Sequence, residues 1–103
     1  METKKIILSE PLLVGGREIT EIEVRQTTIG DEEDALQMAI NMKRARNPMT
    51  TEMAQFSKAT KLPFDAIRNL KTADYLKIRA ALNELNGLSG KPEPDENPTM
   101  PSL

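Results

Sequence analysis

Two close pairs of carboxylates come nearest to a catalytic or metal-binding arrangement in this sequence, Glu21/Glu23 and Glu32/Glu33. Paired carboxylates can exchange protons with a substrate or hold a divalent cation when they face a shared cavity. Glu32 and Glu33, however, fall in the first turn of an expected helix, where negative charge stabilises the helix dipole. Glu21 and Glu23 alternate along an expected strand and share its water-facing side. We therefore interpret both pairs as solvated surface charges.

The residue types of most other catalytic sites do not occur in the chain. Its 103 residues include no His and no Cys, which removes imidazole bases, thiol nucleophiles and the usual zinc and haem ligands. Gly15-Gly16 is not a phosphate-binding loop, because no helix start and no Lys-Ser/Thr pair follow it. We therefore expect no enzyme, no cofactor and no metal.

Length and patterning indicate one small domain over residues 1–87. With only one Tyr and two Phe, its core is expected to be thin and mainly aliphatic. No apolar run approaches the roughly 20 residues of a membrane span, and the N-terminus lacks the apolar stretch of a signal peptide, so we expect a cytoplasmic protein. The segment 88–103 contains four prolines and almost no bulky apolar side chains, which predicts a disordered tail.

The first part of the domain is expected to be a β-hairpin. Apolar segments from Lys4 onward lead to Gly15-Gly16, a typical tight turn. The second strand places Ile22 and Val24 on one face and charged residues on the other. Because a lone hairpin is marginal in water, the apolar face must lie against helices, and Pro11 indicates an edge position.

Four helices are expected to follow, which gives an α+β fold of an N-terminal β-hairpin and a small helical bundle. Asp31, after Gly30, is expected to cap the first helix. Since Pro48 disfavours helix at the preceding residue, Thr50 or Thr51 is expected to cap the second helix, which is expected to run to about Thr60.

The third and fourth helices are expected at 64–70 and 73–86. Pro63 suits the first position of the third helix, and Thr72 is expected to cap the fourth. Gly87 stands where a left-handed C-terminal residue belongs. The fourth helix has a stripe at helical spacing that predicts core, formed by Tyr75, Ile78, Leu82 and Leu85.

The first helix has more apolar surface than one core contact requires. At about 100° per residue, its apolar residues cover an arc of about 220°, whereas a surface helix needs a stripe of about 100° to about 140° for its own core. Methionine adapts its shape to different partners. We therefore predict a protein-binding surface formed by Leu36, Met38, Met42, Met49, Met53 and Phe56. The alternative is that this helix is central, covered on both sides by the second and fourth helices.

Charge is distributed unevenly along the chain. Residues 1–42 carry four basic and nine acidic side chains, and residues 43–85 carry nine and four. Several basic residues lie in the expected last turn of the first helix and beyond it, and they could steer an acidic partner. They are Lys43, Arg44, Arg46, Lys58 and Lys61. A rival interpretation is a small helix-turn-helix-type DNA-binding regulator whose phosphate contacts are Arg68, Lys71, Lys77 and Arg79. The net charge of −2 and the lack of stacking aromatics argue against nucleic acid.

The order and spacing of several short segments also indicate a family. These segments are the Pro-broken first strand Leu8-Ser9-Glu10-Pro11, the strand Ile19 to Arg25, Ile29-Gly30-Asp31, Leu62-Pro63-Phe64, and Leu70 to Leu76. Over about Ile6 to Asn86 the chain resembles the small tail assembly chaperones of contractile-tailed bacteriophages, the group related to phages P2 and Mu. Four positions match recurrent motif positions and are expected to have structural roles, Arg25, Asp31, Asp74 and Tyr75.

The resemblance implies a chaperone in the host cytoplasm that binds the tape measure protein, a very long helical polypeptide, and keeps it soluble until tail tube subunits polymerise around it. Such a chaperone is not expected in the mature virion. In related families a longer, frameshifted product recruits the tail tube protein. Self-association of the chaperone is left open, as is a third interpretation, a structural subunit that remains in the tail. No membrane partner is expected.

Overall fold

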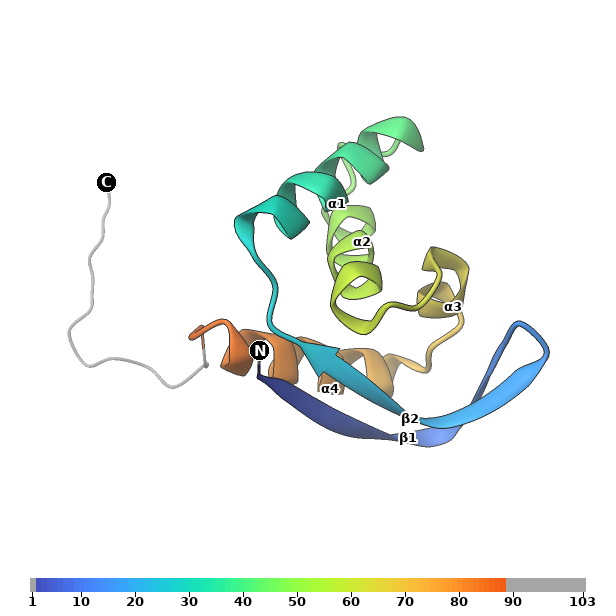
Figure 1. The fold of residues 1–103 in the computed structure, drawn as a ribbon. Helices are drawn as coiled ribbons and strands as arrows, with labels where there is room; N and C mark the ends of the chain where they lie inside the picture. The colour runs from blue at the N-terminus through green and yellow to red at the C-terminus, as the bar shows by residue number, and fades with distance from the viewer. Residues whose placement is uncertain (1, 89–103) are drawn as a thin grey trace.

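The computed structural model describes residues 2–88, with a β-hairpin at one side of the molecule and four helices against and beyond it (Figure 1). The elements are β1 (Thr3–Val14), β2 (Arg17–Arg25), α1 (Ile29–Asn41), α2 (Pro48–Thr60), α3 (Phe64–Arg68) and α4 (Thr72–Leu85). Helix α4 packs on both strands, α2 contacts β2, α3 contacts β1, and α1 packs on α2. This arrangement confirms the expected α+β fold. The expected Pro-rich tail lies outside the described residues.

The hairpin has the predicted turn and the predicted apolar face. Gly15 and Gly16 adopt φ of 58° and 81°, which glycine does without strain and which matches the twist of the two strands. Ile22 and Val24 are buried, and α4 covers this face. The opposite face of β2 is exposed.

The first strand is irregular in its middle. The antiparallel register is interrupted between Ile7 and Leu12, the stretch that contains Pro11. A proline cannot donate to the ladder, so it is tolerated at such an irregularity. The interruption leaves Ser9 without a strand partner in the register, and its N–H bonds to α4 instead.

The core lies between the hairpin, α2, α3 and α4. Phe56 and Tyr75 place their ring centroids 4.7 Å apart at its centre. The predicted stripe of the fourth helix is confirmed, since Tyr75, Ile78, Leu82 and Leu85 are all buried. Aliphatic side chains from β1 and β2 complete the core.

The start of α1 differs from the prediction. Its N-cap is Thr28, whose hydroxyl accepts from the Asp31 N–H while the Asp31 carboxylate accepts from the Thr28 N–H. Asp31 is therefore the third helical residue of a capping box and not the cap itself. The helix also ends earlier, at Asn41, so the expected basic last turn is wrong: Lys43, Arg44 and Arg46 follow the helix.

Helix α2 begins earlier than predicted, at Pro48, and ends where it was expected, at Thr60. The side chain of Asn47 caps it by accepting from the Met49 N–H at 2.9 Å, and Pro48 occupies the first turn. A proline is preorganised for that position and lacks a donor that would be unpaired there. The expected cap at Thr50 or Thr51 is therefore wrong.

The last two helices need smaller corrections. Pro63 is the residue before α3 rather than its first residue, and α3 ends at Arg68. Thr72 is the first residue of α4, and the residue that precedes it makes no side-chain cap. Gly87 has a φ of 77°, which confirms the expected left-handed end of α4.

Helix α1 lies outside the core. Ala35 and Ala39 are fully buried against α2, and their small side chains let the two helices approach closely. Figure 1 shows α1 on the far side of α2 from the hairpin, and α1 makes no comparable contact with α4. The alternative of a central helix covered by the second and fourth helices is therefore wrong.

Candidate protein-binding surface

An apolar stripe runs along the side of α1 that α2 does not cover. Leu36 and Ile40 lie one turn apart and are each 46% exposed, and Ile29 is still more exposed two turns before Leu36. The stripe about 100° around the helix from it, with Ala35 and Ala39, packs on α2. The helix thus has one apolar face toward the fold and a second one toward water.

The predicted methionines come from the α1 and α2 segments of the chain. Met38 and Met42 are half-buried beside the α1–α2 contact, and Met49, at the start of α2, is 53% exposed. Met53 is half-buried and packs against the core. Phe56 is only 2% exposed, which corrects the expectation that its ring belongs to the surface. The spacing of Met49, Met53 and Phe56 places them on one side of α2, but it does not show how deeply each side chain is buried.

The cations predicted to steer a partner also separate into groups. Lys43, Arg44 and Arg46 lie together at the turn between α1 and α2, where they line one surface groove with Ile40. We call these three residues the basic corner. None of them forms an ion pair within residues 2–88.

The other two predicted steering residues lie further along α2. The Lys58 ammonium is 3.3 Å from the Asp34 carboxylate, so its charge is partly compensated. Lys61 terminates α2 in a left-handed conformation and does not line the groove of the basic corner.

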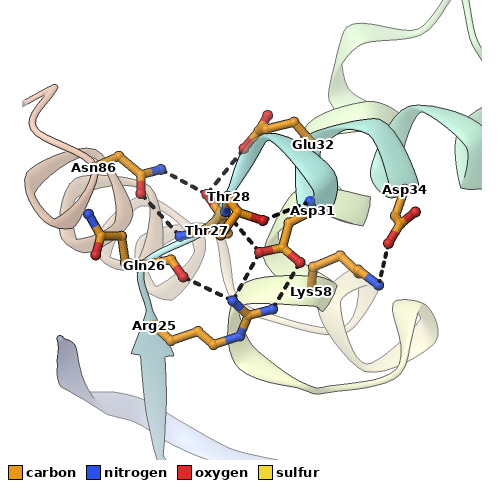
Figure 2. A network of polar contacts seen from close by, with 9 residues as sticks. All are labelled: Arg25, Gln26, Thr27, Thr28, Asp31, Glu32, Asp34, Lys58 and Asn86. Carbon is orange, nitrogen blue, oxygen red and sulfur yellow. Dashed lines mark hydrogen bonds and ion pairs between the residues drawn. The ribbon is translucent and has the colours of Figure 1, made fainter. Parts of the chain in front are cut away.

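A polar network fixes the start of α1 (Figure 2). Arg25, the last residue of β2, donates from two guanidinium nitrogens to the two carboxylate oxygens of Asp31 at 3.0 and 3.2 Å. Chiefly this hydrogen bonding by Arg25, helped by the Thr28 N–H and opposed by burial, lowers the pKa of Asp31 to about 2. The end of the hairpin is thereby locked to the first turn of α1.

The same network reaches α4 and α2. The side-chain oxygen of Asn86 accepts from the Thr27 N–H, and its amide nitrogen donates to the Thr27 hydroxyl. Glu32 accepts from Thr27 and from Gln55 of α2. Figure 2 shows Asn86 and Arg25 on two sides of the linker between β2 and α1, residues 26–28. These contacts orient α1 although it does not touch the core.

Sequence reasoning missed a cleft between the start of α2, α3 and the first turn of α4. Its walls include Met49 and Met53, which were predicted as binding residues, together with Ile67, Leu70 and Tyr75. Arg44 and Arg68 also line it. The sequence signal was weak, because these residues come from α2, α3, α4 and the segments between the helices.

The residues of the rival DNA-binding interpretation are mostly engaged within the protein. Arg79 pairs with Glu52 at 2.7 Å, Lys77 with the buried Asp74 at 3.5 Å, and Lys71 with Glu10 at 3.6 Å. Burial of Glu52 opposes its ionisation, but the bonds from Arg79 and Tyr75 outweigh it and lower the pKa of Glu52. Three of the four proposed phosphate contacts are therefore already used in ion pairs.

Metal-binding clusters and membrane-spanning helices are both missing from the described part of the chain. Residues 2–88 contain no group of three or more His, Cys, Asp or Glu side chains that could bind a metal ion. In the same range no helix has the length and apolarity needed to cross a membrane.

The structure is thus a small α+β fold with an uncovered apolar helix face beside a basic corner. Comparison with known proteins identifies its family. The family model described as "Phage tail assembly chaperone proteins, E, or 41 or 14" matches residues 5–87. The chain therefore belongs to this family, and its role is that of a chaperone in phage tail assembly. No curated protein and no solved structure matches the chain.

Proposed function

We propose that this chaperone binds the tape measure protein of a contractile-tailed phage in the host cytoplasm and keeps it soluble until the tail tube polymerises around it. The observation that carries the proposal is the second apolar face of α1, where Leu36 and Ile40 are each 46% exposed beside the basic corner. A chaperone needs such a surface, because an unassembled helical polypeptide exposes apolar stripes that would otherwise aggregate.

The binding surface is that face of α1, extended by the exposed Met49 at the start of α2. Met38 and Met42 lie about 160° around α1 from Leu36 and Ile40, so they form a second, half-buried flank that with Met53 can adapt its conformation. An adaptable surface suits a client with many similar but unequal stripes. Several weak contacts along one long client also allow release when tube subunits compete for it.

The proposed role involves binding and no catalysis, cofactor or metal. The protein acts before the tail is complete and is absent from the mature virion. A longer frameshifted product that recruits the tail tube protein, and self-association of the chaperone, are compatible additions to this role.

Co-expression with the tape measure protein tests the proposal. Wild-type chain is expected to keep that protein in the soluble fraction, and the double substitution Leu36→Asp with Ile40→Asp is expected to abolish this effect. These positions are better targets than Met38 and Met42, which lie beside the α1–α2 contact. The matched control is Leu13→Asp with Leu76→Asp, since Leu76 is similarly exposed at 48% but lies on α4.

Circular dichroism of both double variants must show the wild-type spectrum for the comparison to count. If the Leu36 and Ile40 variant folds and still keeps the tape measure protein soluble, the surface on α1 is not the binding site. If wild-type chain does not keep that protein soluble, the proposed function itself is wrong.

A further inference from the structure

The cleft between α2, α3 and α4 has the size and lining of an anchor site. Its volume is about 370 Å³, and its apolar walls are Met49, Met53, Ile67, Leu70 and Tyr75. Clefts of roughly 300 to 1,000 Å³ accommodate whole small ligands, so this one has room for apolar side chains of a partner. The two methionines let its shape adjust to different side chains.

The charge of the cleft is positive and uncompensated. Arg44 and Arg68 line it from two different segments, and no acidic side chain does. Neither arginine forms an ion pair with any other residue in the range 2–88. A cleft with low-dielectric walls and charge of one sign concentrates its field on whatever enters.

The cleft continues into the basic corner. Arg44 and Asn47 line both the cleft and the groove at the α1–α2 turn. Met49, on the wall of the cleft, is also one of the exposed apolar residues. A small molecule would occupy the cleft and leave the corner bare, whereas a segment of polypeptide covers both.

We propose that this cleft selects acidic amphipathic helical segments of the client. Apolar side chains from one face of the segment enter the cleft, and carboxylates on the flanking turns pair with Arg44 and Arg68. The inference rests on the proposed function, because it states which segments of the tape measure protein are bound. Burial of the anchor side chains supplies most of the affinity, and the two arginines supply discrimination and rapid association.

Two synthetic helical peptides of one length test this selection against the full chain. Both carry leucines spaced three and four residues apart, and their flanking positions carry Glu in one peptide and Lys in the other. In fluorescence anisotropy at low salt we expect the Glu peptide to bind about tenfold more tightly or better, since like charges at an interface are strongly disfavoured. A third peptide with Ser in place of each Leu is expected not to bind.

Charge-reversal substitutions of the two arginines test whether the peptide binds in the cleft. Arg68→Glu or Arg44→Glu is expected to weaken binding of the Glu peptide by about tenfold. Either substitution is also expected to reduce the preference of the protein for the Glu peptide over the Lys peptide. Arg17→Glu is the matched control, because Arg17 is exposed near the hairpin turn, outside the cleft, and the substitution changes the net charge equally. It is expected to leave binding nearly unchanged.

Several results would overturn the inference. These are equal binding of the Glu and Lys peptides, insensitivity to both cleft substitutions, or an equal loss with Arg17→Glu, which would indicate net charge alone. If a duplex oligonucleotide at similar concentration displaced the peptide, the two arginines would instead be binding nucleic acid.

The co-expression experiment separates this inference from the proposed function. If wild-type chain keeps the tape measure protein soluble but does not discriminate between the peptides, only the inference fails. If that protein is not kept soluble, the proposed function fails whatever the peptides do.

Discussion

The carboxylate of Asp74 accepts hydrogen bonds from both the backbone N–H and the hydroxyl of Ser9, 65 residues earlier in the chain. Ser9 lies in the irregular part of β1, where β2 offers its N–H no hydrogen-bond acceptor in the register. The first turn of α4 supplies that acceptor instead. Burial raises the pKa of Asp74, but the bonds from Ser9 and the charge of Lys77 outweigh this effect and lower it. The pair fastens the hairpin to the last helix.

Substitution of Asp74 is therefore expected to destabilise the fold. Asp74 is 1% exposed, and Asp74→Ala leaves the Ser9 N–H without its acceptor, at an expected cost of about 2 kcal/mol or more in the free energy of unfolding. Urea denaturation measures this cost. Asp65→Ala, at an exposed position of α3, is the control and is expected to change stability by less than about 0.5 kcal/mol. Equal effects of the two substitutions would contradict the assigned role of Asp74.

The Arg25–Asp31 contact predicts a specific pH dependence. A carboxyl whose pKa is lower in the folded state stabilises the fold above its unfolded pKa, here near 3.8, and this contribution is lost as the pH falls toward 2. Asp31→Asn is thus expected to lower the urea midpoint at neutral pH, with the deficit shrinking between about pH 4 and about pH 2.

The companion variant is Arg25→Gln, which removes the partner of the Asp31 carboxylate. Its deficit in the urea midpoint is expected to shrink over the same pH range. A deficit of Asp31→Asn that stays constant down to the lowest pH would mean that the substitution removes packing or capping rather than charge.

Much of the fold was predictable because local rules and periodicity agree with it. Ile22 and Val24 alternate as a buried strand face should, and the spacing of Tyr75 and Ile78 places them on one side of α4. Helix boundaries were harder. Asp31 suits both a cap and the third position of a capping box, and only the conformation of Thr28 decides between them.

The binding surface was only partly predictable for a related reason. Periodicity shows that α1 has excess apolar area, but it does not show which side of the helix a neighbouring helix covers. In the structure the covered side is the one with the small residues Ala35 and Ala39. Ile40 was therefore not singled out, although it is as exposed as Leu36. The cleft was missed because Arg44 and Arg68 come together only through the packing of separate helices.

The left-handed end of α2 allows a stabilising substitution. Lys61 has a φ of 61°, a conformation that costs a residue with a Cβ about 1 kcal/mol and costs glycine little. Lys61→Gly is expected to raise the free energy of unfolding by about 0.5 kcal/mol, after the larger entropy of the unfolded glycine chain is deducted. Lys58→Gly, inside the same helix, should instead destabilise by about 1 kcal/mol. Destabilisation by Lys61→Gly would contradict the described conformation.

Steering by the basic corner predicts salt-sensitive association with the client. The Debye length falls from roughly 30 Å at 0.01 M salt to about 10 Å at 0.1 M, so the association rate measured by stopped flow is expected to fall over this range. Replacing Lys43, Arg44 and Arg46 by Gln should lower the rate and flatten its salt dependence. The same replacement at Lys5, Arg17 and Lys71, away from the corner, should leave the slope nearly unchanged, and an equal flattening would refute a local effect.

Leu88, the last described residue, lies beside the start of α1. Leu88 and Ile29 line one depression, together with the linker that Asn86 fastens, so the backbone departs beside the first turn of α1. That helix of 13 residues spans about 20 Å, and the basic corner lies past its other end. A protein fused after Leu88 would thus start at the opposite end of α1 from Arg44 and Arg46, and the basic corner would stay accessible.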